Sequence, residues 1–381
     1  MTTPAKRPRA RDLGIEIGTL IPGTTNSITD VPGVRVGHCT LIAGAGPRVT
    51  GSGPVRTGVT VVMPNLQPWR QPVFAGTHRL NGNGELTGME WVRESGLLTS
   101  FIGLTNTHSV GVVRDALVAH EVSQRAPGEV FFALPVVGET YDGTLNDING
   151  FHVRAEHVQS AISQASSGPV TEGSVGGGTG MICHGFKGGI GTASRVISAG
   201  SEQYVVGVLV QANHGRRPRL SVNGVPVGLS LGPELVPVPP LPDQTPPGSG
   251  SIIVVVATNA PLLPVQCNRL AQRAGLGIAR TGGAGEHGSG DIFLCFATGN
   301  TLPAEFSRAG QTEVPLSMLA NQHITELFYA AIEATEEAIL GAMLASETMT
   351  GADGTSVHAL PADLLCDLLT RAGRMRGSIT G

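Results

Sequence analysis

A serine stands at the junction between a flexible segment and a rigid one. Residues 233–250 contain seven prolines and end in glycine, which predicts an exposed, semi-extended connector. Ser251 then opens residues 251–258, an unbroken apolar run that predicts a strand buried on both faces. Cleavage between Gly250 and Ser251 would leave a hydroxyl and a free α-amine on one residue. An α-amine has a pKa of about 7.7–8.0, so it can accept the proton of the hydroxyl near neutral pH. An ordinary linker followed by a strand is the alternative.

The type of residue on each side of this bond suits self-cleavage. Gly250 lacks a Cβ atom and therefore tolerates a strained peptide bond under attack. Asp291 is the first residue of another predicted buried strand, 291–297, and Ser289 lies two residues before it. Ser289 could pass a hydrogen bond to Ser251, and Asp291 could orient it. A turn capped by Ser and Asp is the alternative interpretation.

Two further groups of polar residues follow predicted strands. Asn213 comes at the end of strand 204–210, where its side-chain amide could donate to a developing oxyanion, although Asn is also a common turn residue. Glu139 and Tyr141 follow predicted strand 130–137. The carboxylate could hold the ammonium of a substrate's amino end, and the tyrosine hydroxyl could help to bind or protonate. A solvated acidic loop is equally compatible with this second motif.

The elements that must position these residues follow from apolar periodicity. Strands are expected at 57–63 and, with glycine interruptions, at 181–197, in addition to the four named above. Amphipathic or capped segments predict helices at 109–123, 152–163, 259–274, 324–344 and 361–371. Residues 1–30 are expected to form a loose arm, and residues 218–231 a hairpin around Asn223-Gly224. Strands interspersed with helices predict a layered α/β architecture.

Composition excludes several classes of protein. The 381 residues carry a net charge of -4, with 40% hydrophobic and 14% charged residues, which argues against disorder and against a nucleic-acid partner. Residues 1–12 lead into no apolar stretch, and no run of about 18 apolar residues follows, so we expect no membrane association and a cytoplasmic location. The five cysteines form no C-x-x-C pair and the eleven histidines no close cluster along the chain, so we expect neither a metal site nor a cofactor.

Seven motifs together resemble a known family. They are Thr29–Val34, Asn81–Gly88, Asn146–Gly150, Gly176–Met181, Gln211–Asn213, Gly250–Val254 and Ser289–Phe293. In this order, and over about residues 12–375, they resemble the L-aminopeptidase D-amidase/D-esterase family, which includes the β-peptidyl aminopeptidases.

The resemblance implies a four-layer αββα sandwich like that of N-terminal-nucleophile hydrolases. It also implies one domain, 1–381, that cleaves itself into residues 1–250 and 251–381, and a homo-oligomer of such heterodimers. The implied substrates are small peptides, amides or esters. The implied roles are nucleophile for Ser251, support for Ser289 and Asp291, oxyanion binding for Asn213, amino-group binding for Glu139 and a pocket position for Tyr141. Some members carry Glu where this chain has Asp291, which is one methylene shorter.

Two other functions remain open at the level of sequence. Acyltransferases of the ornithine acetyltransferase type process themselves in a similar way, but they use Thr where this chain has Ser251. A non-catalytic protein could use the glycine-rich loops to hold a ligand. That protein would persist as one chain of 39.2 kDa, whereas the enzyme would separate into two fragments.

Overall fold

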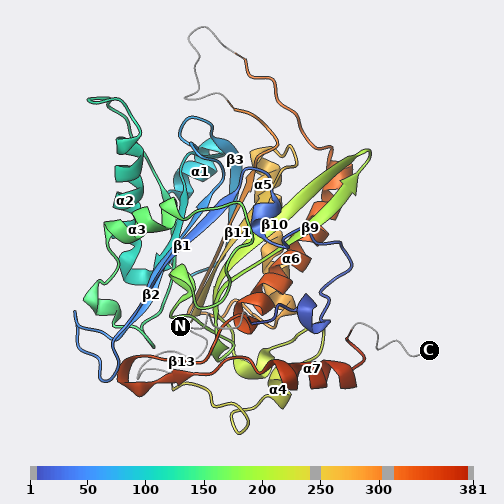
Figure 1. Ribbon diagram of the computed structural model, residues 1–381. Coiled ribbons are helices and arrows are strands. Elements are labelled where there is room, and N and C mark those ends of the chain that lie inside the picture. The colour runs from blue at the N-terminus through green and yellow to red at the C-terminus, as the bar shows by residue number, and fades with distance from the viewer. Residues whose placement is uncertain (1–6, 241–249, 303–312, 376–381) are drawn as a thin grey trace.

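Two mixed β-sheets lie face to face in the centre of the molecule (Figure 1). The computed structural model describes residues 7–240, 250–302 and 313–375. The first sheet has the order β1 (Arg35–Ala43), β2 (Val55–Met63), β5 (Ile102–Asn106), β6 (Val136–Thr140). The second has the order β4 (Leu97–Leu98), β3 (Val73–Gly82), β12 (Ser289–Ala297), β11 (Gly250–Thr258), β10 (Glu202–Asn213), β9 (Gly189–Ala199).

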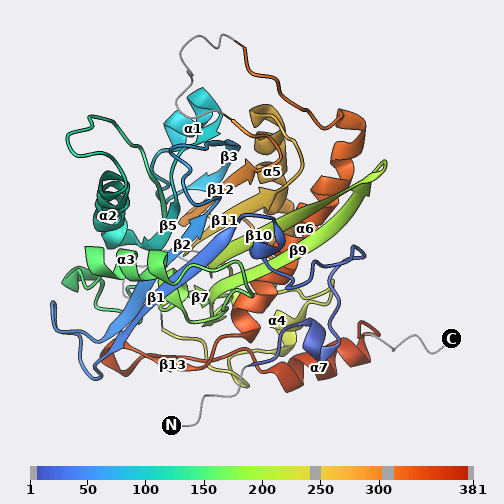
Figure 2. The same ribbon diagram turned by 45° about the horizontal axis from the view of Figure 1, so that its top comes forward.

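Helices cover both outer faces of this pair of sheets (Figures 1 and 2). Helices α2 (Val110–Ser123) and α3 (Ala155–Ser163) pack on the first sheet, and α5 (Pro264–Arg280) and α6 (Ile324–Leu344) on the second. One apolar layer fills the space between the sheets, and one lies under each pair of helices. The expected four-layer αββα sandwich is therefore confirmed.

The other strands and α-helices of the described chain are short. They are α1 (Met89–Ser95), β7 (Ile182–Cys183), β8 (Phe186–Lys187), α4 (Val227–Ser230), β13 (Met349–Thr350), β14 (Ser356–Val357) and α7 (Ala362–Arg371). None of the described helices is long and apolar enough to pass through a lipid bilayer.

Strand β11 occupies the middle of the second sheet, parallel to β12 and antiparallel to β10 (Figure 2). Its side chains alternate as strand geometry requires. Ile252 and Val254 join the apolar layer under the helices, whereas Ile253 and Val255 join the layer between the sheets. The alternation therefore turns the side chain of Ser251 toward the first sheet.

Several expected elements have different limits in the structure. The helix predicted from residue 259 begins at Pro264, because the Asn259 side chain accepts a hydrogen bond from the Val205 amide at 2.7 Å instead of capping a helix. Proline in the first turn still marks the start. The Asn223-Gly224 turn forms, with φ of 51° and 79°, but it joins only a single bridge between Val222 and Val225 and not a hairpin of strands.

The strand predicted at 130–137 is wrong over most of its length. Strand β6 begins at Val136, and the preceding residues form a surface loop in which Val130 is 96% and Phe132 74% exposed. A short apolar run does not reveal whether tertiary structure covers it.

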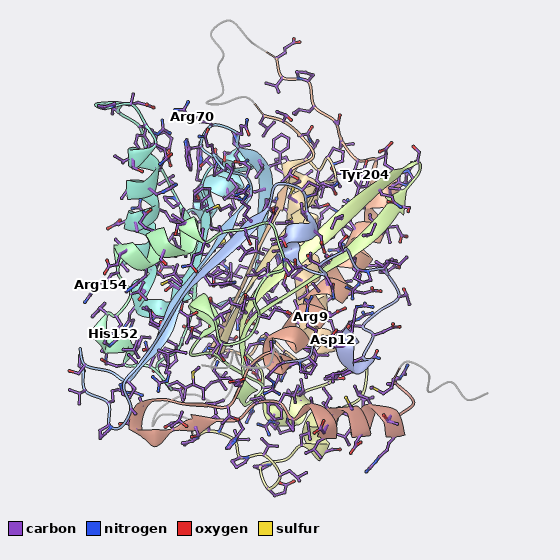
Figure 3. The ribbon with its side chains drawn as sticks, in the orientation of Figure 1. Arg9, Asp12, Arg70, His152, Arg154 and Tyr204 are labelled. Carbon is purple, nitrogen blue, oxygen red and sulfur yellow. The ribbon has the colours of Figure 1, made fainter. Side chains whose placement is uncertain are left out.

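The expectation of a loose arm at the start of the chain is also wrong for its described part. Ile15 and Ile17 are fully buried against the layer that α6 covers. Arg9 donates to the carbonyls of Thr25 and Asn26 and pairs with Glu172 at 2.6 Å. Figure 3 labels Arg9 and Asp12 in this segment. Within the proline-rich connector, residues 233–240 are mostly exposed, as expected, and residues 241–249 lie outside the described part of the chain.

Candidate active site

Ser251 lies between two strands that carry other candidate residues. On β10 its register partner is Asn213, and on β12 its register partner is Gly290. Ser251 is only 3% exposed. The junction singled out from sequence therefore lies inside the molecule, at the edge of the layer between the sheets.

Gly250 fits a space that admits no side chain. A Cβ atom there would lie 2.6 Å from the Asn213 carbonyl oxygen and 3.1 Å from the Cα of His214. On the other side, Gly250 pairs with Ser289. The Gly250–Ser251 bond is thus enclosed by neighbouring strands on both sides.

The Asn213 side chain is held by main-chain groups on two elements. Its Oδ1 accepts a hydrogen bond from the Ile182 amide at 2.8 Å, and its Nδ2 donates to the Tyr141 carbonyl at 3.0 Å. Because a carboxamide nitrogen carries two hydrogens, one N–H remains to donate to an oxyanion beside Ser251.

Ser289 and Asp291 form one hydrogen-bonded unit. Ser289 Oγ donates to Asp291 Oδ1 at 2.7 Å, and both side chains are buried. Burial raises the pKa of Asp291 to about 6, Ser289 acts in the opposite direction, and Glu286 adds to the increase. By strand alternation this unit lies on the helix side of the sheet, next to Gly250, whereas the Ser251 hydroxyl lies on the other side. The unit therefore lies next to Gly250, on the sheet face opposite to the one that the Ser251 hydroxyl faces.

Glu139 reaches the site from the first sheet. A Cβ atom on Gly84 would lie 3.2 Å from Glu139 Oε1 and 3.1 Å from the Cα of Gly290, so Gly84 separates the carboxylate from the strand beside Ser251. Glu139 accepts hydrogen bonds from the Glu85 amide at 2.9 Å and from the Thr107 hydroxyl. Burial raises its pKa, against the effect of these hydrogen bonds. The site thus contains a buried carboxylate that faces β12, the strand next to Ser251.

Tyr141 contributes to the site through its main-chain carbonyl. Its carbonyl accepts from Asn213, while its phenol is 44% exposed and approaches Gly143, where a Cβ atom would lie 2.3 Å from the hydroxyl oxygen. Among the candidate residues, Tyr141 has the most exposed side chain.

Three contributors to the site lack a side-chain signal in the sequence. The Ile182 amide positions Asn213, Gly84 admits Glu139, and the Asn83 amide donates to the Ser289 carbonyl at 3.2 Å. Gly84 and Asn83 belong to a turn-rich motif that the sequence marks, but Ile182 acts through its backbone and carries no such mark.

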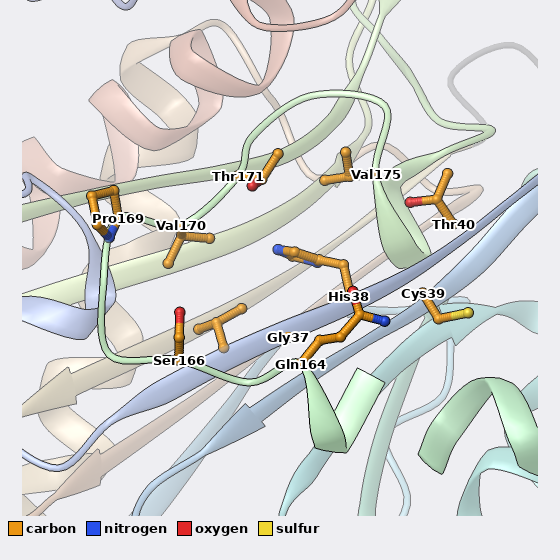
Figure 4. Close-up of a pocket in the computed structure, with 11 residues that line it drawn as sticks. Gly37, His38, Cys39, Thr40, Gln164, Ser166, Pro169, Val170, Thr171 and Val175 are labelled. Atoms are coloured by element: carbon orange, nitrogen blue, oxygen red, sulfur yellow. The ribbon is translucent and has the colours of Figure 1, made fainter. Parts of the chain in front are cut away.

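A cavity of about 470 Å³ lies elsewhere, over β1 (Figure 4). His38, Thr40 and Thr171 contribute to its wall, and the strands β10, β11 and β12 do not. It is therefore separate from the candidate active site.

A four-layer sandwich with a serine at the start of its central strand defines a hydrolase of the N-terminal nucleophile class. The model of the protein family described as "Peptidase family S58" matches residues 26–357. The chain belongs to this family. The β-peptidyl aminopeptidase BapA of Sphingosinicella microcystinivorans is 49% identical over 378 residues, which cover 97% of this chain and 94% of the relative. The BapA of Sphingosinicella xenopeptidilytica is 44% identical, over 95% and 91% of the two chains.

Solved structures agree with this assignment. A Burkholderia sp. β-aminopeptidase superposes with a TM-score of 0.87 at 54% identity, covering 96% of this chain and 99% of that one. The L-aminopeptidase D-Ala-esterase/amidase of Ochrobactrum anthropi, described as a prototype for the serine aminopeptidases and a variant of the Ntn hydrolase fold, superposes with a TM-score of 0.87 at 42% identity. That match covers 97% of this chain and 100% of the other.

Proposed function

We propose that the chain cleaves itself between Gly250 and Ser251 and then acts as a serine aminopeptidase, with amidase and esterase activity, on short substrates. The observation that carries the proposal is the position of Ser251, the first residue after the connector, in register with Asn213 and Gly290. Membership of peptidase family S58 supports the same function.

Self-cleavage begins with attack of Ser251 Oγ on the Gly250 carbonyl carbon. The Gly250–Ser251 C–N bond breaks, the hydroxyl proton passes to the released amine, and an ester joins Gly250 to Ser251 Oγ. Water then hydrolyses the ester and leaves a carboxylate on Gly250. The products are residues 1–250 and 251–381, which remain together through the sheet pairing of β11.

Hydrolysis of a substrate repeats this chemistry. Glu139 holds the substrate's ammonium group, and Ser251 Oγ attacks the carbonyl of the amino-terminal residue. The α-amine of Ser251 takes the hydroxyl proton and delivers it to the leaving amine, while Asn213 donates to the oxyanion. The Ser289–Asp291 unit orients that α-amine, because it lies beside the Gly250–Ser251 peptide. Water then releases the acyl group.

The relatives support a narrower substrate class. Two of them are β-peptidyl aminopeptidases, and one solved relative is a β-aminopeptidase. We therefore propose that amino-terminal β-amino acids are the preferred residues. A homo-oligomer of heterodimers and a cytoplasmic location complete the proposal, and gel filtration and cell fractionation test them.

Intact mass spectrometry of the purified protein tests self-cleavage directly. The wild-type chain should yield two fragments that meet at Gly250 and Ser251, and Ser251→Ala should yield one chain. Turnover of β-alanyl, L-alanyl and D-alanyl p-nitroanilides then tests substrate class. An active wild-type protein that consists of one unbroken chain would contradict the scheme, and equal turnover of the three substrates would contradict the β-preference alone.

A further inference from the structure

Three buried side chains of types that can bind a metal lie together near the end of β10. Cys183 and His184 lie at the turn between β7 and β8, and His214 follows Asn213 at the end of β10. One potential ligand atom from each lies within 4.8 Å of the others, and Cys183 Sγ is 3.8 Å from His214 Nδ1. In a three-coordinate site of one sulfur and two nitrogens, neighbouring ligand atoms are roughly 3.5–3.8 Å apart, given the bond lengths to the ion. Small rotations would close the remaining gap.

The imidazole of His184 is prepared to act as a ligand. Its Nδ1 lies 3.2 Å from the Arg216 carbonyl oxygen and must donate to it, because a carbonyl only accepts. The lone pair is therefore on Nε2. Among the described residues, the buried Nε2 atoms of His184 and of His214 have no hydrogen-bond partner. A backbone carbonyl that fixes the tautomer in this way is the usual outer support of a metal-bound histidine.

The turn itself holds His184 in an uncommon backbone conformation. Its φ is 50° and that of Gly185 is 71°, a pair that favours Asn-Gly over His-Gly. The His184 amide also donates to the His214 carbonyl at 2.7 Å, which fixes the two imidazole-bearing segments together. A histidine at a position where asparagine is the better residue is consistent with a role for its ring.

The surroundings determine which ion suits the cluster. Cys183 and His184 are 0% exposed and His214 is 4% exposed, so water is not at hand as a fourth ligand, which zinc sites require. Arg217 Nε donates to the His184 carbonyl at 3.0 Å and places a guanidinium beside the cluster. This positive charge disfavours a divalent ion, whereas a monovalent ion with one thiolate is neutral overall.

We propose that Cys183, His184 and His214 form a binding site for a thiophilic monovalent metal ion, Cu(I). Thiolate and imidazole are ligands that Cu(I) accepts. On binding, the Cys183 thiol releases its proton to solvent, and the ion forms one bond to sulfur and two to nitrogen without a change in oxidation state. The ion ties the β7–β8 turn, whose Ile182 amide positions Asn213, to the strand that carries Asn213. The site does not depend on the proposed catalytic function.

Anaerobic titration of the purified full-length protein with Cu(I), against a chromophoric Cu(I) chelator, tests the site. One equivalent should be withheld from the chelator by the wild type. Cys183→Ala and His184→Asn should each weaken binding about tenfold or more, the range found when metal-site residues are removed. His184→Asn is suited to the turn and so preserves the fold. Cys366→Ala, which removes a half-buried cysteine on α7, is the matched control and should bind as the wild type does.

X-ray absorption of the Cu(I)-loaded wild type provides a readout that needs no variant. One sulfur and two nitrogen neighbours are expected. Unchanged binding by His184→Asn, or a copper shell of sulfur alone, would overturn the assignment. Binding of Zn(II) with the same affinity and the same dependence on Cys183 would overturn the preference for a monovalent ion.

Discussion

Asn213 and Ser251 are register partners on β10 and β11, and strand alternation turns both side chains toward the first sheet. The Asn213 amide is fixed by the Ile182 amide and the Tyr141 carbonyl, so its remaining N–H has a defined direction before substrate arrives. A donor fixed in advance stabilises an oxyanion without reorganisation at the moment of reaction.

Replacing Asn213 by Ala should therefore lower kcat by about 10²–10³-fold. Asn213→Asp keeps an acceptor for the Ile182 amide but loses the donor, so it should be similarly slow with the fold intact. Steady-state kinetics on β-alanyl p-nitroanilide measure both, and mass spectrometry follows self-cleavage in parallel. Retention of more than about a tenth of kcat by Asn213→Asp would exclude the oxyanion role, because the effect assigned to such a donor is larger.

Gly250→Ala should slow self-cleavage. Its Cβ would lie 2.6 Å from the Asn213 carbonyl oxygen, a backbone atom that moves only if β10 moves. Strain of about 1–3 kcal/mol in this contact displaces the reacting carbonyl and lowers the rate about tenfold or more. The fraction of cleaved chain after timed expression measures the effect. Gly111→Ala, at a helix position with open space around it, is the control and should cleave normally.

The sequence predicts most of the fold correctly where local pattern and tertiary environment agree. The run 251–258 is apolar without interruption and becomes the central strand, and the stripe over 324–344 becomes α6. The prediction is wrong where the local pattern and the tertiary environment disagree. The apolar residues Val130, Phe132 and Leu134 remain at the surface, and the polar, proline-containing start of the chain is fixed by Arg9 and Ile15. Such choices depend on what packs nearby, which no local pattern contains.

For the site too, the sequence predicts what depends on local pattern and misses what depends on tertiary contacts. Ser251, Ser289 and Asn213 are recognised because their types and their positions at strand ends suit the chemistry. The approach of Glu139 to β12 past Gly84 depends on the contact between the sheets. The cluster of Cys183, His184 and His214 was not expected, because 29 or more residues separate the last histidine from the other two, and only the β7–β8 turn brings them together.

Ionisation of Asp291 should give the activity an acid limb near pH 6. Burial raises the pKa of this carboxyl to about 6, and only its ionised form is restricted to accepting the Ser289 hydrogen bond. Activity should therefore fall as the pH drops through about 6. Because the folded pKa lies above the ordinary 3.8, the contribution to stability has the opposite sign: it is present below 3.8 and lost as the pH rises through about 6.

The profile of kcat/KM against pH checks this assignment. Asp291→Asn should lose the acid limb, and Asp115→Asn, on the exposed side of α2, should keep it. Asp291→Glu tests the reach of the carboxyl, since it adds one methylene to the side chain, and it should retain the limb. A limb that survives in Asp291→Asn would assign it to another group.

Neutralising Glu139 should weaken substrate binding more than the chemical step. Glu139→Gln keeps the shape of the side chain but loses a charge-assisted hydrogen bond worth about 1.5–3 kcal/mol, so KM should rise about ten- to hundredfold. Substrates with an acetylated amino end should be poor for both proteins. Kinetics with free and acetylated substrates measure the effect, and Glu94→Gln, at an exposed position, is the control. A collapse of kcat at constant KM would instead make Glu139 an acid or base in the reaction.

The largest predicted loss of stability comes from Arg195, which is fully buried on β9. It donates to Glu333 at 3.0 Å, to Glu337 at 2.6 Å and to the Ile17 carbonyl at 2.7 Å, and so joins α6, β9 and the start of the chain. Arg195→Met leaves two buried carboxylates without this partner, which costs about 3–5 kcal/mol. Although burial raises the pKa of Glu337, Arg195 and Arg11 hold it below its ordinary value. The stability that Glu337 contributes is thus present at neutral pH and lost as the pH falls.

Urea denaturation in a Ser251→Ala background, where one chain is followed, measures this loss. The deficit of Arg195→Met should shrink at acid pH, because protonation of Glu337 removes a buried charge that then has only Arg11 as its arginine partner. Arg371→Met, at the exposed end of α7, should change the free energy of unfolding by less than about 0.5 kcal/mol. A deficit that stays constant from neutral to acid pH would show that Arg195 acts through packing and its bond to Ile17, and not through the carboxylates.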